Sequence, residues 1–238
     1  MRAAQINEYG DTSVITVDEI DKPVPKEGQV LVEVHASSLN PFDTAIRAGY
    51  MKEMIPLTFP VTLGGDIAGV VSELGEGVTT LSVGDKVYGQ ANVVAGNSGA
   101  FAQFSATIAT QVAKMPENLD YKTAASLPLV GVSALQAIKE HINLQSGQKI
   151  FIHGGAGGIG TVAIQIAKSI GAFVATTATG ERIDYVKKLG ADTVIDYKAS
   201  DFVQEIKDYD AVFDTVGGDD FDKTLTVLKQ GGIAVSMI

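Results

Sequence analysis

The sequence contains no cysteine. A chain without thiols forms no disulfide, offers no thiolate ligand to zinc and has no cysteine nucleophile. Basic residues are also few: 18 lysines and arginines stand against 28 aspartates and glutamates, and the net charge is −10. Because the phosphates of a nucleic acid would be repelled by such a surface, we expect no nucleic-acid partner.

Long apolar runs and targeting patterns are missing as well. No segment approaches the roughly 20 apolar residues that a membrane-spanning helix needs. The first residues, MRAAQINEYGD, have no apolar core of the kind found in signal peptides. We therefore expect no membrane partner and a cytoplasmic location. What is present, 45% hydrophobic and 19% charged residues, is typical of a globular enzyme.

The pattern of residues along the chain changes near residue 121. Before it, segments 30–36, 69–74 and 85–91 are short, β-branched and separated by glycine and proline turns, which predicts a small barrel or sandwich. After it, a helical connector is interrupted near Pro128. The connector leads into predicted strands 148–153, 172–178, 193–197, 209–216 and 233–237, alternating with predicted helices 159–170, 181–189, 200–207 and 221–229. Such alternation predicts βαβ units with a mostly parallel sheet.

A glycine-rich turn, HGGAGGIG (153–160), follows the first of these strands. A flexible linker would continue into polar, aperiodic sequence. Here an apolar stripe at helical spacing follows instead, made of Ile159, Val162, Ala163, Ile166, Ala167 and Ile170. Gly154, Gly157 and Gly160 therefore form a strand-to-helix turn, which suits a dinucleotide whose diphosphate approaches the helix N-terminus.

The second strand predicts which dinucleotide binds. NAD sites usually carry a carboxylate at this strand end, about 20 residues past the loop, whereas here residues 176–179 read Thr-Thr-Ala-Thr. Hydroxyls such as that of Thr177, with the guanidinium of Arg182 close behind, suit a 2′-phosphate and favour NADPH. The alternative is that Arg182 is a solvated residue in the first turn of a helix.

The sequence resembles the zinc-free quinone oxidoreductase branch of the medium-chain dehydrogenase/reductase superfamily, which includes zeta-crystallin-like reductases. It is closer still to the 2-alkenal reductase and chloroplast quinone-oxidoreductase-like group. The motifs that carry the resemblance occur in family order: LNPFDTAIRAGY (39–50), VTLGGDIAGVV (61–71), VGDKVYG (83–89), GAFAQF (99–104), LPLVGVSALQA (127–137), HGGAGGIG (153–160), LGADTVIDY (189–197) and FDTVGG (213–218).

The resemblance implies an α/β protein with two domains. An N-terminal GroES-like β-barrel catalytic domain is expected over 1–121, and a Rossmann doubly wound parallel sheet that binds NADP over 122–238, with the active site in the cleft between them. Zinc-dependent relatives carry a cysteine before the aspartate of the first motif and Gly-His-Glu in the second. Neither is present around Asp43 or before Asp66, so no metal is expected.

The resemblance also implies site residues. The nicotinamide would be met by Asn40 and its ribose by Ser133, the diphosphate by Gly157, Gly158 and Ile159, and the 2′-phosphate by Arg182 and Tyr197. Val216 and Gly217 would border the cofactor. Asn40 would also face the substrate, and Tyr50 is a substrate-side candidate because an aromatic ring beside the first motif suits stacking on a planar substrate. No catalytic residue is assigned, because a proton can come from solvent.

Each of these residues has a structural alternative. Asn40 would cap the turn before Pro41, Ser133 would bond to its own backbone, and Tyr197 and Tyr50 would be packing and surface residues. For Asp66 we favour a structural role in its loop. The three histidines have no metal-ligand spacing, and none is assigned to a site.

The implied activity is hydride transfer from NADPH to a quinone or similar conjugated carbonyl substrate without zinc. Two alternatives stay open, a 2-alkenal or enone reductase and a nucleotide-binding protein of low turnover. The sequence ends at the fifth predicted strand, where relatives continue, so we expect either a C-terminal truncation or a short variant. Full-length relatives are expected to form homodimers.

Overall fold

The computed structural model describes residues 1–237 and contains two compact units, one from Met1 to Leu129 and one that begins at Val130. The elements of the first unit are β1 (Arg2–Ile6), η1 (Thr12–Val14), β2 (Ile15–Glu19), β3 (Gln29–Ser38), α1 (Pro41–Ala48), β4 (Val61–Thr62), β5 (Asp66–Leu74), β6 (Lys86–Gln90), η2 (Val93–Ala95), β7 (Phe104–Ile108), η3 (Ala109–Gln111), β8 (Val112–Lys114) and α2 (Tyr121–Ala125). Helix α3 (Pro128–Leu135) begins at the boundary between the units.

The second unit continues with η4 (Gln136–His141), β9 (Lys149–His153), α4 (Gly158–Ile170), β10 (Phe173–Ala178), α5 (Arg182–Lys188), β11 (Thr193–Asp196), α6 (Phe202–Glu205), β12 (Tyr209–Asp214), α7 (Asp220–Thr226) and β13 (Leu228–Ser236). Among residues 1–237, none of the helices combines the length and the apolar character that crossing a bilayer requires.

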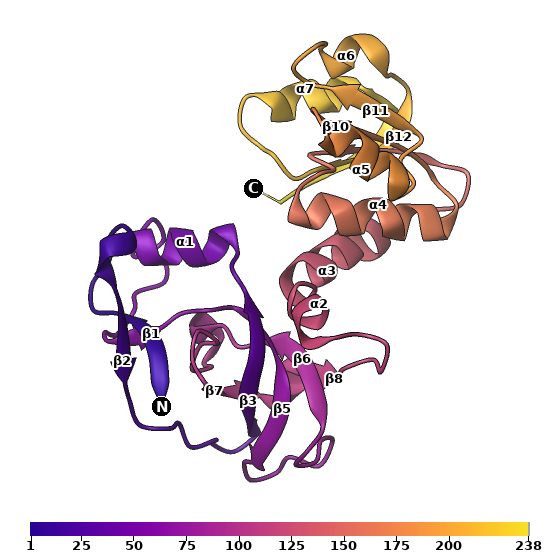
Figure 1. Ribbon diagram of the computed structural model, residues 1–238. Helices are drawn as coiled ribbons and strands as arrows, with labels where there is room; N and C mark the ends of the chain where they lie inside the picture. The colour runs from indigo at the N-terminus through magenta and orange to yellow at the C-terminus, as the bar shows by residue number, and fades with distance from the viewer. Residues whose placement is uncertain (238) are drawn as a thin grey trace. The chain divides into compact units, whose positions relative to one another are not determined.

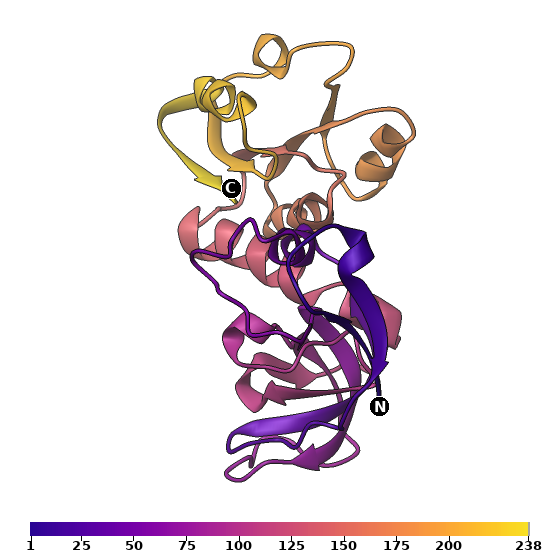
Figure 2. The same ribbon diagram turned by 90° about the vertical axis from the view of Figure 1, so that its left-hand side faces the viewer.

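The first unit is built from short strands, as predicted, and these strands pair antiparallel. One sheet has the order β2-β1-β4 and the other β7-β3-β5-β6-β8, and an isolated bridge pairs Ala3 of β1 with Ala102, two residues before β7. The strands of the larger sheet run side by side in both views (Figure 1, Figure 2). Val30, Val32 and Ile67 are buried at the centre of this sheet, because alternate residues of neighbouring strands face the same side.

Helix α2 belongs to the first unit. The compact units meet at residues 129 and 130, whereas the sequence pattern puts the domain boundary at 121 and 122. The difference has a packing cause: Ala124 and Ala125 of α2 are buried in one cluster with Ala68 of β5. A helix that reads as connector therefore completes the apolar core beside β5.

The second unit is a parallel sheet of order β11-β10-β9-β12-β13. Counted along the chain, this order is 3-2-1-4-5, the doubly wound arrangement that the sequence predicts. Helices α4 and α5 cover one face, while α6 and α7 lie on the other (Figure 1). Strand β9 serves both faces, since Ile150 and Ile152 join one apolar cluster and Phe151 joins the other.

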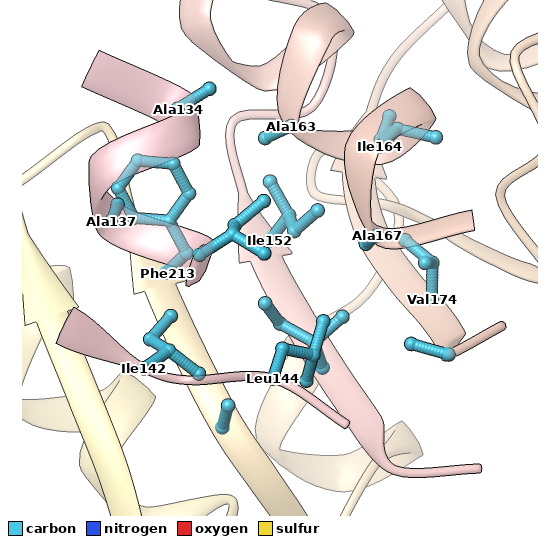
Figure 3. Close-up of a cluster of buried hydrophobic side chains, with 14 of the residues drawn as sticks. Ala134, Ala137, Ile142, Leu144, Ile152, Ala163, Ile164, Ala167, Val174 and Phe213 are labelled. Carbon is cyan, nitrogen blue, oxygen red and sulfur yellow. The ribbon is translucent and has the colours of Figure 1, made fainter. Parts of the chain in front are cut away.

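The apolar stripe of α4 packs on the first of these faces. Figure 3 shows Ile152 of β9 between Phe213 of β12 and the α4 residues Ala163 and Ile164, which are all fully buried. The helix begins at Gly158 and ends at Ile170, with Gly171 at φ 90° as its left-handed cap. These bounds agree with the predicted helix to within one residue, and Ile164 adds a buried position that the predicted stripe omits.

The last predicted elements differ from the structure. Helix α7 ends at Thr226 and β13 begins at Leu228, so the predicted helix 221–229 is wrong over its last residues. Strand β13 pairs with β12 at Leu228 and again from Ile233, with an irregularity between the two stretches. Because that irregular stretch contains glycines, its own sequence does not indicate a strand, and the strand depends on its pairing with β12.

Candidate functional site

The glycine-rich turn of the second unit connects β9 to α4. Gly154 has a φ of 85°, which favours glycine, and an added Cβ would lie 2.6 Å from Oγ1 of Thr215. Its backbone N–H donates to Oγ1 of Thr177 at 2.9 Å. The loop is thus held between the ends of β10 and β12, with Gly157 as the residue before the first turn of α4.

Gly160 lies beneath this loop. A Cβ there would overlap the carbonyl oxygen of Gly154 and lie 2.6 Å from the Cα of Gly155. The loop therefore rests directly on the first turn of α4, and the N–H groups of that turn are left for a ligand.

A cavity of about 740 Å³ opens at the carboxyl edge of the parallel sheet. It is lined by residues at or just after the ends of β9, β10, β11 and β12, among them His153, Ala178, Tyr197 and Thr215. Open α/β sheets bind ligands at this edge, where the strand order reverses. Among the predicted cofactor residues, the cavity brings together Gly154, Gly157, Thr177, Arg182, Tyr197 and Val216.

Two cations at this cavity form no salt bridge with the residues that the structure describes. Within residues 1–237, the side chains of Arg182 and Lys198 form no hydrogen bond or ion pair, although both line the cavity. The acids of the cavity have other partners: Asp220 pairs at 2.8 Å with Lys223, which also lines the cavity, and Asp201 accepts the N–H of Val203. The end of the cavity between α5 and the loop after β11 is therefore suited to an anion.

Asp196, at the end of β11, has donors of its own and accepts the backbone N–H of Lys198 at 3.1 Å. A hydrogen bond from the hydroxyl of Thr179, that N–H and the charge of Lys198 lower the pKa of the Asp196 carboxyl. Asp196 is not among the residues that line the cavity.

The other predicted cofactor residues lie outside the cavity lining. Ile159 is half-buried against the apolar cluster of the unit, Gly158 begins α4, and Gly217 is buried with its N–H donated to Asp214 at 2.9 Å. Ser133 lies half-buried on α3, and its hydroxyl has no hydrogen bond among residues 1–237.

Two further residues of the cavity, Lys198 and His153, are not among the site residues predicted from the sequence. Lys198 follows the predicted Tyr197 at a strand end, so a search for cations at every strand end would find it. His153 is only 4% exposed, and its Nδ1 lies 2.9 Å from Oδ1 of Asp214. No local sequence pattern links His153 to Asp214, because the pairing of β9 with β12 brings them together.

In the first unit, Asn40 and Tyr50 line one open depression of about 490 Å³ with Leu39 and α1 residues. Tyr50 is 84% exposed, while Asn40 is buried at the start of α1. The Asn40 amide nitrogen donates to Oδ2 of Asp66 at 2.8 Å and to the Ser38 hydroxyl at 3.2 Å. Both amide hydrogens are thereby used, which fixes the orientation of this side chain.

Asp66 is the centre of that network. Its carboxylate also accepts the Ser38 hydroxyl at 2.5 Å and the N–H of Leu129 at 3.0 Å. Burial raises the pKa of Asp66, although these donors oppose the shift. Burial also raises the pKa of the neighbouring Asp43, and the charge of Asp66 adds to that rise. The contacts of Asp66 fit the structural role that the sequence analysis favours for it.

The raised pKa of Asp66 predicts a stability trend. Over a pH window above the ordinary carboxyl value, the folded protein holds a proton that the unfolded chain has released. The stability from this group is therefore fully present below the unfolded pKa and is lost as pH rises through the folded pKa. Asp66→Asn cannot titrate at this position. We therefore expect its unfolding free energy to increase relative to that of the wild type as the pH rises from about 4 to neutrality.

Urea unfolding of both proteins at a series of pH values measures this difference. Asp21→Asn removes an exposed carboxylate from the same unit and is the matched control, for which we expect no such trend. A difference between Asp66→Asn and the wild type that stays constant with pH would contradict the prediction.

Within the part of the chain that the structure describes, no three histidine, cysteine, aspartate or glutamate side chains are grouped so that they could hold a metal ion. A 3-2-1-4-5 parallel sheet with a glycine loop and a cavity at its carboxyl edge, preceded by an antiparallel β unit, defines the class of two-domain dinucleotide-binding proteins. Comparison with known proteins narrows this class.

Residues 26–117 match the Alcohol dehydrogenase GroES-like domain, and residues 158–237 match the Zinc-binding dehydrogenase family. The human Quinone oxidoreductase is 32% identical over 98% of this chain and 71% of its own length. The chain therefore belongs to the quinone oxidoreductase branch of the medium-chain dehydrogenase/reductase superfamily.

Two plant proteins are similar over a smaller share of their lengths. The 2-methylene-furan-3-one reductase of Solanum lycopersicum is 36% identical over 99% of this chain and 61% of the relative. The chloroplastic NADPH-dependent alkenal/one oxidoreductase of Arabidopsis thaliana is 36% identical, over 100% of this chain and 62% of the relative. The chain thus spans less than two thirds of these two relatives.

Solved structures agree with this family. The quinone oxidoreductase from Coxiella burnetii has a TM-score of 0.92 and 36% identity, over 99% of this chain and 75% of that structure. The Escherichia coli quinone oxidoreductase in complex with NADPH has a TM-score of 0.89 and 29% identity, over 99% of this chain and 72% of that structure.

Proposed function

We propose that this chain forms the core of an NADPH-dependent oxidoreductase that reduces a quinone or a similar conjugated carbonyl without zinc. The observation that carries the proposal is the cavity at the sheet edge, where the glycine loop meets two unpaired cations and the end of β10 carries no carboxylate. Relatives named for quinone and NADPH-dependent alkenal or alkenone reduction support the choice of reaction.

The residues of the cavity fit NADPH. The bare backbone of Gly157 leaves the N-terminus of α4 open to a diphosphate, because an added Cβ would meet only the Gly154 carbonyl oxygen at 3.3 Å. Arg182 and Lys198 suit the two negative charges of a 2′-phosphate, and Tyr197 lies on the same side of the cavity.

When bound, NADPH would supply the hydride that reduces the conjugated carbonyl. The chain would orient the cofactor through the glycine loop and the 2′-phosphate residues. Asn40 and Tyr50, which share the depression of the first unit, are proposed to face the substrate, where Tyr50 offers an aromatic surface for a planar ring. Zinc is not required in this proposal, because the chain has no cysteine ligand and Asp66 is engaged by three donors.

Reduction of an alkenal or alkenone is the second candidate. It is favoured by the 36% identity to the tomato and Arabidopsis reductases, which exceeds the 32% to the human quinone oxidoreductase. Hydride delivery to an electron-poor conjugated carbon is common to both reactions, so the two candidates differ in the acceptor and not in the cofactor residues. A homodimer, as expected for full-length relatives, stays a prediction.

An acceptor panel tests the proposal. NADPH oxidation is followed at about 340 nm with a naphthoquinone, a phenanthrenequinone and an α,β-unsaturated aldehyde. We expect turnover with at least one of them, and faster turnover with the quinones for the first candidate. Tight NADPH binding without oxidation by any acceptor would contradict both reductase functions and support a nucleotide-binding protein of low turnover.

A further inference from the structure

A buried histidine lines the proposed cofactor cavity without having a role in it so far. The His153 ring is 4% exposed and lies 5.2 Å from the Phe202 ring and 5.8 Å from the Phe151 ring, centroid to centroid. Its Nδ1 lies 2.9 Å from Oδ1 of Asp214, which is fully buried. The ring is therefore held in one orientation by packing and by a hydrogen bond.

Asp214 determines which ring nitrogen carries the proton. Its Oδ1 also accepts the N–H of Val216 at 3.2 Å, and its Oδ2 accepts the N–H of Gly217 at 2.9 Å. A carboxylate surrounded by donors acts only as an acceptor, so Nδ1 of His153 must be the N–H that faces it. In the neutral imidazole, Nε2 then carries a lone pair and no hydrogen.

Nε2 is free to meet a ligand. Within residues 1–237, every fully buried side-chain nitrogen and oxygen has a hydrogen-bond partner, and Nδ1 is the ring nitrogen of His153 that has one in the protein. Nε2 is therefore not fully enclosed, and the space that His153 lines is the cavity. A polar side chain this deeply buried needs a partner for its free nitrogen, which a ligand or water must supply.

The surroundings of His153 suit a planar base. Phe202 packs against the His153 ring and lines the cavity with it. Asp220, whose carboxylate interacts with the charge of His153, lines the same cavity and is paired with Lys223. The cations Arg182 and Lys198 belong to α5 and to the loop after β11. Phosphate oxygens accept hydrogen bonds, and they gain nothing from an acceptor nitrogen. In the adenosine half of a dinucleotide, the 6-amino group of adenine is a donor on a planar apolar ring, and that combination matches this wall.

We propose that Nε2 of His153 accepts a hydrogen bond from the 6-amino group of adenine, and that Asp214 fixes the tautomer on which this depends. His153 is then a cofactor-contacting residue and Asp214 a positioning residue. The proposal rests on the proposed binding of NADPH, and it adds selection of the base to the recognition of the 2′-phosphate.

The test compares NADPH with reduced nicotinamide hypoxanthine dinucleotide phosphate, in which a 6-oxo group replaces the 6-amino group. Both keep the fluorescent dihydronicotinamide, so one titration measures both dissociation constants on the full chain. For the wild type we expect about five- to tenfold tighter binding of NADPH, the effect of one hydrogen bond replaced by two facing acceptors. An unfolded fraction would weaken the apparent binding of both ligands by the same factor, so it does not change the ratio of the two dissociation constants.

Two variants sharpen the test. In His153→Phe a planar aromatic ring is kept and the acceptor is lost, so the ratio should fall to about one. In Asp214→Asn, the amino group should face His153, because the carboxylate oxygen on that side has the longer backbone hydrogen bond, 3.2 Å against 2.9 Å. That amino group donates to Nδ1, Nε2 becomes a donor, and the preference should turn toward the 6-oxo ligand.

Equal binding of both ligands to the wild type would overturn the inference and leave NADPH binding intact. A wild-type ratio retained by Asp214→Asn would overturn the role of Asp214. If the wild type binds neither ligand, the proposed function fails together with the inference. Should Asp214→Asn not fold, the wild type and His153→Phe still decide the contact.

Discussion

Gly160→Ala is expected to lower the unfolding free energy of the α/β unit by about 3 kcal/mol, at the upper end of overpacking effects. The added Cβ would overlap the carbonyl oxygen of Gly154 and lie 2.6 Å from the Cα of Gly155. Both are backbone atoms, which cannot rotate away as the end of a side chain can. The loop must therefore lift from the first turn of α4, and NADPH affinity should fall at least tenfold with it.

Gly157→Ala is the matched variant. The backbone of Gly157 has φ −79° and ψ 171°, which any residue adopts, and the added Cβ would lie 3.3 Å from the Gly154 carbonyl oxygen. Alanine is a poorer residue than glycine before a helix, which costs less than about 1 kcal/mol. The methyl group would nevertheless stand where the diphosphate is proposed to approach, so affinity should fall without a comparable loss of stability.

Thermal unfolding and NADPH titration of both variants separate the two effects. For a unit of this size, 3 kcal/mol corresponds to a fall in Tm of about 12–24 °C. Gly160→Ala should lose both stability and affinity, and Gly157→Ala mainly affinity. Unchanged stability in Gly160→Ala would mean that the loop does not rest on α4 as described.

The features that sequence predicts well are those with local causes. Helix α4 is bounded by Gly157 and Gly171, its apolar stripe is continuous, and the predicted start differs from the observed one by a single residue. The same holds for the end of β10, where a run of hydroxyl residues with no carboxylate is readable without knowing what lies opposite. A residue type, a spacing and a cap are all contained in one short segment.

The features that sequence misses depend on neighbours distant in the chain. His153 and Asp214 are 61 positions apart and become partners because β9 pairs with β12 in the register that sets them side by side. The start of β13 depends in the same way on its irregular pairing with β12. A local pattern reports what a segment can form, and the register between strands decides which side chains meet.

The site residues divide in the same way, into those predicted from local patterns and those that are not. Gly154 and Gly157 of the glycine loop and Thr177 at the end of β10 line one cavity, because they stand at the carboxyl ends of adjacent parallel strands. Ser133 and Asn40 rest on the family resemblance alone, and their roles stay predictions. Asp66 and Ser38 accept both hydrogens of the Asn40 amide, which fixes the orientation of this side chain.

Arg182→Ala is expected to weaken NADPH binding about 30-fold and to leave NADH binding nearly unchanged. Arg182 lines the cavity at the start of α5, and its guanidinium has no partner among residues 1–237. A charge-assisted hydrogen bond to a 2′-phosphate contributes about 2 kcal/mol, which corresponds to that factor. NADH has no phosphate at this position, so the same variant has nothing to lose with it. Titration of both nucleotides measures the ratio directly.

Lys187→Ala is the control, because Lys187 is an exposed cation in the last turn of the same helix and does not line the cavity. It changes the net charge by the same amount, so a long-range effect of charge would appear in both variants and fall with added salt. Lys198→Ala should weaken NADPH less than Arg182→Ala, since an ammonium offers a single point of charge where a guanidinium offers a planar fork. Equal losses for NADPH and NADH in Arg182→Ala would remove the 2′-phosphate from this end of the cavity, and the hydroxyls at the end of β10 would then need another explanation.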